Sequence, residues 1–289
     1  MVMRAQVVYN IICISFMIIA EAITISFIYD VHAHIFPDKI AKRASEMIGG
    51  FYSLEMAAEG TVSELLKLGG KAGINKYMVH SVAVVPKNAV HINDFVASTV
   101  NSNPKLFTGF LTLHPDMENM EAELERAMGL GLKGVKIHPD MQKFALDDKG
   151  ADKLFAICEG VCPVLIHTGD PRYSYSNPEQ MARVLKNHPR LTAICAHLGG
   201  WGEWTDAARV LADKNVYVDT SSSLYAITKE EARAAIDAYG YERVLFGTDY
   251  PMWDATQELE RFHALGLSDK AEEMILGKNL LALLGETAE

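Results

Sequence analysis

The chain has 289 residues, 49% of them hydrophobic and 22% charged, which is an ordinary globular composition with enough length for one large core or two smaller ones. Its formal net charge of -10 argues against a nucleic-acid-binding protein, because phosphate groups require a basic surface. The four cysteines are too few and too irregularly spaced for a disulfide framework, and we interpret Cys13, Cys158, Cys162 and Cys195 as buried thiols.

Residues 1–28 form an apolar amino-terminal extension that has three interpretations. Residues 1–22 fit a signal peptide, with Arg4 as its basic region and Ala20-Glu21-Ala22 as its cleavage site. A membrane anchor is marginal, because spanning a bilayer takes about 20 apolar residues and this run is shorter. The interpretation that we favour is a mis-assigned start, with the true start downstream, for example at Met17. We therefore expect a cytoplasmic protein, exported if residues 1–22 act as a signal peptide, and no membrane partner is required.

The first strand is expected where the apolar run Ile23–Tyr29 leads into the sequence Asp30-Val-His-Ala-His34. Side chains of a strand alternate between its two faces, so Asp30, His32 and His34 are predicted to point the same way. A helix is expected at Asp38–Ile48, followed by a loop over residues 49–60. The sequence Thr61-Val-Ser-Glu64 then predicts a capping box that opens a second helix.

Seven further strands are predicted, several of them near-continuous apolar runs of the kind found in parallel sheets. They are expected at Tyr77–Val82, Leu106–His114, Gly134–His138, Pro163–His167, Leu191–His197, Val216–Asp219 and Val244–Asp249. Helices are expected between them at Asn88–Val100, Glu118–Leu130, Lys149–Glu159, Pro178–Asn187, Thr205–Lys214 and Lys229–Tyr239, and two short helices at Ser268–Leu284 close the chain.

Eight strand–helix units in roughly 250 residues predict an α/β fold, specifically a (β/α)8 TIM barrel that occupies residues 29–289 as one domain. A doubly wound open sheet is the alternative. It is less favoured, because no Gly-x-Gly-x-x-Gly sequence follows any predicted strand.

Histidines gather at the carboxyl ends of the predicted strands, where barrel enzymes build their active sites. Of the ten histidines, six lie at such ends: His32, His34, His114, His138, His167 and His197. His80, in contrast, is expected inside a strand.

Three imidazoles and one carboxylate are predicted to hold one divalent metal ion. His32, His34 and His167 offer nitrogen ligands and Asp249 offers an oxygen, a set that suits zinc best, and manganese or iron in a more open shell. Such an ion lowers the pKa of bound water to about 7 and polarises a substrate oxygen. Asp249 is expected to take the proton from that water, and His197 to orient the water or stabilise developing negative charge. The alternatives are a capping carboxylate for Asp249 and a histidine bonded to a carbonyl for His197.

Lys136 and His138 share one face of the fourth predicted strand and are candidate substrate-binding residues. Lys136 has three interpretations: it binds a substrate carboxylate, it bridges a second metal ion after carbamylation, or it forms an ion pair with Asp30 across the barrel.

Loops after the fifth and sixth strands supply three more candidate substrate-binding residues, Arg172, Tyr173 and Trp204. A guanidinium among aromatic side chains suits a small anionic molecule, which can itself be aromatic. The alternative is that Arg172 pairs with Asp170 and that the tryptophan packs in a lid. Because the first loop, residues 35–60, is short, we expect a fairly open site.

Five sequence motifs together resemble the amidohydrolase superfamily, and more narrowly its amidohydrolase-related branch, which includes aminocarboxymuconate-semialdehyde decarboxylase. They are DVHAH at 30–34, GVKIHP at 134–139, HTGD at 167–170, AHLGG at 196–200 and FGTDYP at 246–251. The resemblance runs from about residue 29 to the end, while residues 1–28 depart from it. It implies a barrel of the metallo-dependent hydrolase type with His32, His34, His167 and Asp249 as ligands and His197 as a catalytic residue. It also implies a homodimer, by the habit of the family.

The resemblance does not fix the reaction, because the branch hosts hydrolysis, non-oxidative decarboxylation and hydration. The sequence leans slightly to a metal-dependent hydrolase in which metal-activated water attacks a small, anionic substrate. One alternative is a non-oxidative decarboxylase, a carbon–carbon lyase acting on a small carboxylic acid. The other is a metal-binding barrel without turnover.

Overall fold

The computed structural model describes residues 27–288, so most of the apolar extension lies outside the described residues. The described part contains one sheet of eight parallel strands in the order β1 to β8. The strands are β1 (Tyr29–His34), β2 (Lys76–His80), β3 (Phe107–Thr112), β4 (Gly134–Ile137), β5 (Val164–Ile166), β6 (Ala193–Cys195), β7 (Val216–Asp219) and β8 (Val244–Leu245). The predicted (β/α)8 TIM barrel is confirmed.

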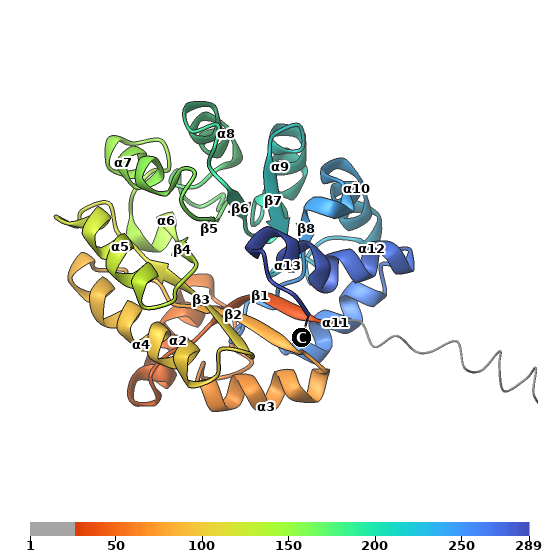
Figure 1. Ribbon diagram of the computed structural model, residues 1–289. Coiled ribbons are helices and arrows are strands. Elements are labelled where there is room, and N and C mark those ends of the chain that lie inside the picture. Colours follow the sequence, from red (N-terminus) through yellow and green to blue (C-terminus); the bar gives the residue numbers. More distant parts are fainter. Residues whose placement is uncertain (1–26, 289) are drawn as a thin grey trace, which may run out of the picture.

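Helices surround the strands in chain order, as Figure 1 shows from α3 through α4, α5, α7, α8 and α9 to α10. They are α2 (Asp38–Tyr52), α3 (Val62–Ala72), α4 (Ala89–Ser102), α5 (Met120–Gly129), α6 (Pro139–Gln142), α7 (Lys149–Cys158), α8 (Pro178–Asn187), α9 (Trp204–Leu211), α10 (Lys229–Tyr239), α11 (Ala255–His263), α12 (Asp269–Glu273) and α13 (Asn279–Leu284). A turn of π-helix at Met274–Lys278 joins the last two. No helix among residues 27–288 is long and apolar enough to cross a membrane.

The first and last strands meet through hydrogen bonds that nearly close the barrel. The backbone N–H of Val31 donates to the carbonyl of Phe246 at 2.9 Å, and that of His34 donates to the carbonyl of Tyr250 at 2.7 Å. The buried carboxylate of Asp30 adds two more bonds, accepting from the backbone N–H of Thr248 at 3.0 Å and from its hydroxyl at 2.6 Å. Asp30 therefore helps to join the two ends of the sheet. The prediction that Asp30 points the same way as His32 and His34 is wrong: Asp30 does not line their cavity, because the pairing of β1 with β2 shifts register between Asp30 and Ala33.

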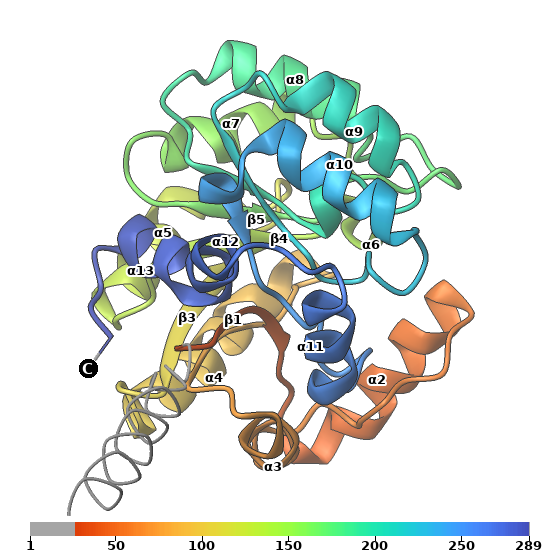
Figure 2. The same ribbon diagram turned by 90° about the vertical axis from the view of Figure 1, so that its right-hand side faces the viewer.

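An apolar cluster fills the barrel interior on the side away from the carboxyl ends of the strands. Its fully buried members come from six strands and include Val31, Met78, Phe110, Leu165, Ile194 and Leu245, and Leu280 of α13 packs against them. Side-chain packing of this kind makes the barrel a solid core, so the site can lie only at one end. Figure 2 shows α2 and α13 on opposite sides of the barrel.

Two helix predictions needed correction. The first helix does not end at Ile48 but continues to Tyr52, and the expected loop is correspondingly shorter. The capping box forms only in half: the Thr61 hydroxyl accepts from the backbone N–H of Glu64 at 3.2 Å, but the Glu64 carboxylate accepts from the backbone N–H of Glu59 instead.

Candidate active site

One cavity at the carboxyl ends of the strands collects most of the predicted site residues. It is lined by His32, His34, Lys136, His138, His167, His197 and Asp249, together with Ile48, Tyr52, Met56, Met141, Pro251 and Met252. Its volume is about 30 Å³, which leaves room for about two water molecules. The expectation of an open site is wrong, because the end of α2 and the residues after it cover the mouth.

Three predicted ligand atoms lie at the mutual distances that one metal ion requires. His32 Nε2 is 3.3 Å from His34 Nε2 and 3.3 Å from Asp249 Oδ1, and His34 Nε2 is 3.6 Å from the same oxygen. Donors of a tetrahedral ion with bonds of about 2.1 Å stand about 3.4 Å apart. Two imidazoles and a carboxylate, all neutral or anionic, therefore fit a divalent cation.

Buried hydrogen bonds fix the orientation of His32. Its Nδ1 lies 2.9 Å from Asp219 Oδ2 and 3.0 Å from the hydroxyl of Ser221. A proton on Nδ1 that is donated to the carboxylate leaves the lone pair on Nε2, which is the atom that faces His34 and Asp249. Asp219 thus acts as the carboxylate behind a ligating imidazole.

His167 lines the cavity, but its ring nitrogens contact a different group of residues. Its Nδ1 is 2.9 Å from His197 Nε2, and His197 Nδ1 is 3.0 Å from the carbonyl oxygen of Ser221. A carbonyl oxygen only accepts hydrogen bonds, so the neutral ring of His197 donates from Nδ1 and accepts at Nε2. The hydrogen bond that His197 Nε2 accepts therefore keeps the proton of His167 on the Nδ1 of His167. The Nε2 of His167 then carries a lone pair, is buried without a hydrogen-bond partner among the described residues, and lies 3.7 Å from Asp140 Oδ2.

Burial sets the charge state of the cavity. It lowers the pKa of His32, His34, His138 and His167 well below the usual histidine value, with further lowering by neighbouring groups that include Lys136. Burial likewise lowers the pKa of His197 to about 4 and that of Lys136 to about 8, and it raises the pKa of Asp249 to about 6. Neutral imidazoles are the form that binds metal ions.

The backbone is strained at the two residues that the sequence marked as catalytic. His197 has φ 61° and Asp249 has φ 58°, in the left-handed region that non-glycine residues rarely adopt. Such conformations cost about 1–3 kcal/mol each and persist where the surroundings impose them. The Ser222 hydroxyl donates to the second carboxylate oxygen of Asp249 and holds that side chain in place.

The structure places Lys136 and His138 in the cavity. The ammonium of Lys136 lies 3.2 Å from His32 Nε2. The suggested ion pair between Lys136 and Asp30 does not form, because Asp30 is engaged by Thr248. The ring of His138 stacks on that of His167 with centroids 3.8 Å apart.

The loop residues Arg172, Tyr173 and Trp204 do not line the cavity. The guanidinium of Arg172 makes two bonds to Asp170, at 2.9 and 2.7 Å, which is the alternative that the sequence had left open. Tyr173 is 42% exposed, and the Trp204 indole donates to the Ser223 hydroxyl at 3.1 Å.

Three residues near the site were missed from the sequence. Tyr52 lies over the cavity with its hydroxyl 2.7 Å from His138 Nε2. His80 ends β2 and packs against the rings of His32 and His34, and Asp219 ends β7 behind His32. A polar residue at the end of an apolar strand was the available signal for Asp219.

The fold and the donor set together define a metallo-dependent TIM barrel. The family model described as amidohydrolase matches residues 29–285, and the chain therefore belongs to the amidohydrolase family. This membership agrees with the enzyme of hydrolase or carboxy-lyase type that the sequence predicted.

Comparisons with individual proteins add the following likenesses. A 2-amino-3-carboxymuconate-6-semialdehyde decarboxylase of Dictyostelium discoideum is 25% identical over 243 residues, which cover 68% of this chain and 66% of that protein, slightly under two thirds of its length. An uncharacterized TIM-barrel protein of Bordetella bronchiseptica is 25% identical with a TM-score of 0.73, covering 89% of this chain and 98% of the other. A dihydroxybenzoic acid decarboxylase of Polaromonas, with bound manganese and an inhibitor, is 17% identical with a TM-score of 0.68, covering 90% and 97%.

Proposed function

We propose that this protein is a metal-dependent, non-oxidative decarboxylase of a small carboxylic acid. The observation that carries the proposal is the cavity itself, where the donor atoms of His32, His34 and Asp249 lie 3.3–3.6 Å apart beside the buried ammonium of Lys136. The relatives named as decarboxylases support this reaction over the hydrolysis that the sequence favoured. Hydrolysis by metal-activated water is the second candidate, since the family model itself is described as amidohydrolase.

The ligand set remains the one that the sequence predicted: His32, His34, His167 and Asp249. When bound, a divalent ion supplies a Lewis acid that holds substrate oxygens and stabilises negative charge. The donor set suits zinc, whereas the Polaromonas relative holds manganese, so the metal's identity is part of the test.

Residues of the chain supply binding, orientation and the proton. The Lys136 ammonium pairs with the substrate carboxylate, and the neutral ring of His138 lies next to it. Decarboxylation breaks the bond between carbon and the carboxylate and leaves its electron pair on carbon, which then takes a proton. We assign delivery of that proton to Asp249, whose carboxylate is oriented by the Ser222 hydroxyl. His197 positions His167 by accepting, at its Nε2, a hydrogen bond from the Nδ1–H of His167.

Substrate binding requires movement at the mouth. Pockets that hold small molecules usually measure about 300–1,000 Å³, far more than the cavity's roughly 30 Å³. Tyr52 and Met56, which cover the cavity, are the side chains that must move. The guanidinium carbon of Arg172 lies 5.1 Å from the centre of the Tyr52 ring, and Arg172 is the cation that such a movement would bring to an anionic substrate. Tyr173 and Trp204 remain candidate substrate-binding residues in this proposal.

The test is an activity panel with metal-loaded protein. Elemental analysis first identifies the bound metal, and the protein is then incubated with hydroxybenzoic acids, muconate semialdehydes, esters and lactones. Release of carbon dioxide without incorporation of oxygen from labelled water supports the decarboxylase, whereas incorporation supports the hydrolase. Stoichiometric metal without turnover of any substrate would leave a metal-binding barrel, and Asp249→Asn must abolish whichever activity is found.

The expected homodimer is tested separately, by the mass of the metal-loaded protein in solution. Twice the mass of one chain supports the homodimer, and a single chain mass contradicts it.

A further inference from the structure

We propose that His80, at the carboxyl end of β2, is an additional imidazole ligand of the metal ion held by His32 and His34. This inference rests on the proposed function, because it concerns the same ion. It adds a ligand that neither the motifs nor the likeness to known proteins supplied.

His80 is a fully buried imidazole without a partner. Its exposed fraction is 0%, and neither Nδ1 nor Nε2 makes a hydrogen bond within residues 27–288. Buried polar atoms are nearly always satisfied, and those that are not call for a partner such as an ion or an ordered water. A neutral imidazole has one nitrogen with a lone pair, and in His80 this lone pair is free to bind a metal ion.

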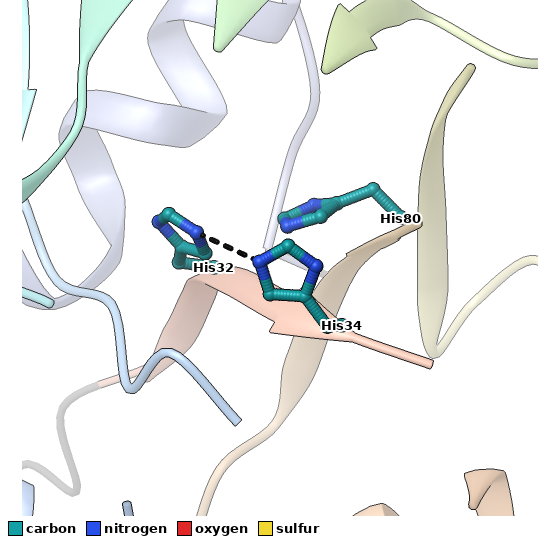
Figure 3. Close-up of side chains that lie close together, drawn as sticks. All are labelled: His32, His34 and His80. Atoms are coloured by element: carbon teal, nitrogen blue, oxygen red, sulfur yellow. Dashed lines mark hydrogen bonds between the residues drawn. The ribbon is translucent and has the colours of Figure 1, made fainter. Parts of the chain in front are cut away.

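The position of His80 places it against the predicted metal ligands. Its ring meets that of His34 edge to face, with centroids 4.5 Å apart, and lies 5.0 Å from that of His32 (Figure 3). The parallel pairing of β1 with β2 sets His34 opposite His80, so two adjacent strands present the three rings together. One ligand atom from each of the three residues lies within 4.8 Å of the others.

The same geometric criterion separates His80 from His167. Besides His32, His34 and Asp249, described above, three groups of donors meet it: His32, His34 and His80; His32, His197 and Asp249; and His138, Asp140 and His167. His167 falls in a group without His32, and because its Nδ1 is engaged by His197, Nε2 is the atom that it offers to the ion. His80, in contrast, falls in a group with both His32 and His34. The arrangement points to an imidazole donor from β2 for the ion on β1.

The experiment uses the full chain, freed of metal by a chelator and titrated with Co²⁺. Cobalt serves as the probe because its absorption and its paramagnetically shifted imidazole N–H proton signals report the ligands directly. Metal-binding affinity and the number of shifted N–H signals are compared for the natural chain, His80→Ala, and His114→Ala. The last is the matched control, because His114 also follows a barrel strand but belongs to none of the candidate metal-binding groups found among the described residues.

If His80 is a ligand, His80→Ala loses one shifted N–H signal and binds Co²⁺ about 100-fold more weakly, at the upper end of the effect seen for residues that only support ligands. His114→Ala keeps the count and the affinity. An unchanged signal count in His80→Ala overturns the inference, even if the affinity falls, because the residue would then only position its neighbours.

Two further variants keep the outcome decisive. His80→Phe retains an aromatic ring for the edge-to-face contact but has no nitrogen, so it must reproduce the loss if His80→Ala fails to fold. His32→Ala tests the proposed function: it must lose Co²⁺ binding. If the natural chain itself binds no Co²⁺, the proposed function fails. The proposed function stands if the natural chain binds Co²⁺ and His32→Ala does not. If, in addition, His80→Ala and His80→Phe bind Co²⁺ as tightly as the natural chain, only the role of His80 as a ligand fails.

Discussion

Replacement of Asp219 by asparagine tests whether His32 is prepared for metal binding by the carboxylate behind it. Asp219 is fully buried and accepts hydrogen bonds from the ring of His32 at 2.9 Å, the backbone N–H of His197 at 3.1 Å and the backbone N–H of Ser221 at 3.0 Å. Asp219→Asn keeps the shape of the side chain but removes the negative charge that holds the proton on His32 Nδ1.

Hydrogen bonds to a charged group contribute about 1.5–3 kcal/mol each, against about 1 kcal/mol for neutral ones. Loss of the charge therefore weakens the His32 contact by about 1–2 kcal/mol, which corresponds to a roughly 5–30-fold weaker metal affinity. The upper part of this estimate overlaps the range of about 10–100-fold known for such supporting carboxylates.

The assay is a competition titration of metal-free protein against a chromophoric chelator, with thermal unfolding of the metal-free protein measured alongside. The control is Asp206→Asn, an exposed carboxylate of α9 whose replacement should leave the affinity unchanged. An Asp219→Asn protein that folds and binds metal with unaltered affinity would refute the idea that this carboxylate orients His32.

Three other predictions concern the fold. Metal removal should lower the free energy of unfolding, because a ligand present at 1,000 times its Kd stabilises the native state by about 4 kcal/mol. A chelator should therefore lower Tm, and an unaltered Tm would contradict a structural contribution of the ion. Burial raises the pKa of Glu258 to about 7, so its ionisation costs the fold nothing at low pH and about 3 kcal/mol above pH 7. Glu258→Gln should therefore leave stability nearly unchanged at pH 5 and increase it at pH 8 in urea unfolding, and an equal effect at both pH values would disprove the assignment. Gly169 has φ 79°, and an added Cβ would lie 2.5 Å from the backbone of Gly200; Gly169→Ala should destabilise by about 2 kcal/mol or more in the same assay, and a neutral result would show that the two loops can separate.

Sequence reasoning succeeded where the signal is local. Apolar, β-branched runs mark the strands, and a histidine or aspartate directly after such a run lies at the barrel mouth, as His167, His197 and Asp249 do. Because the carboxyl ends of parallel strands meet at one end of the barrel, residues far apart in the chain could be assigned to one cavity.

The misses come from contacts that only the folded chain makes. Gly49 and Gly50 suggest the end of a helix, yet α2 continues to Tyr52. Gly49 serves close packing instead, because an added Cβ would lie 2.7 Å from the carbonyl oxygen of Leu54. Because α2 extends to Tyr52, the side chain of Tyr52 lines the cavity, which the sequence did not predict. The end of β2 at His80 is set by pairing with His34 on β1, which no local pattern reveals.

The bond between Asp30 and Thr248 joins residues 218 positions apart, and this separation has a consequence for how the protein matures. His32 and His34 leave the ribosome early, but Asp249 follows only after seven strands have been made. Contacts between residues so distant in sequence form late, because the intervening chain must be ordered first. A growing chain thus presents imidazole ligands without the Asp249 carboxylate, and a complete metal site exists only in a chain whose last strand has docked. Metal uptake during synthesis would therefore report the completion of the barrel.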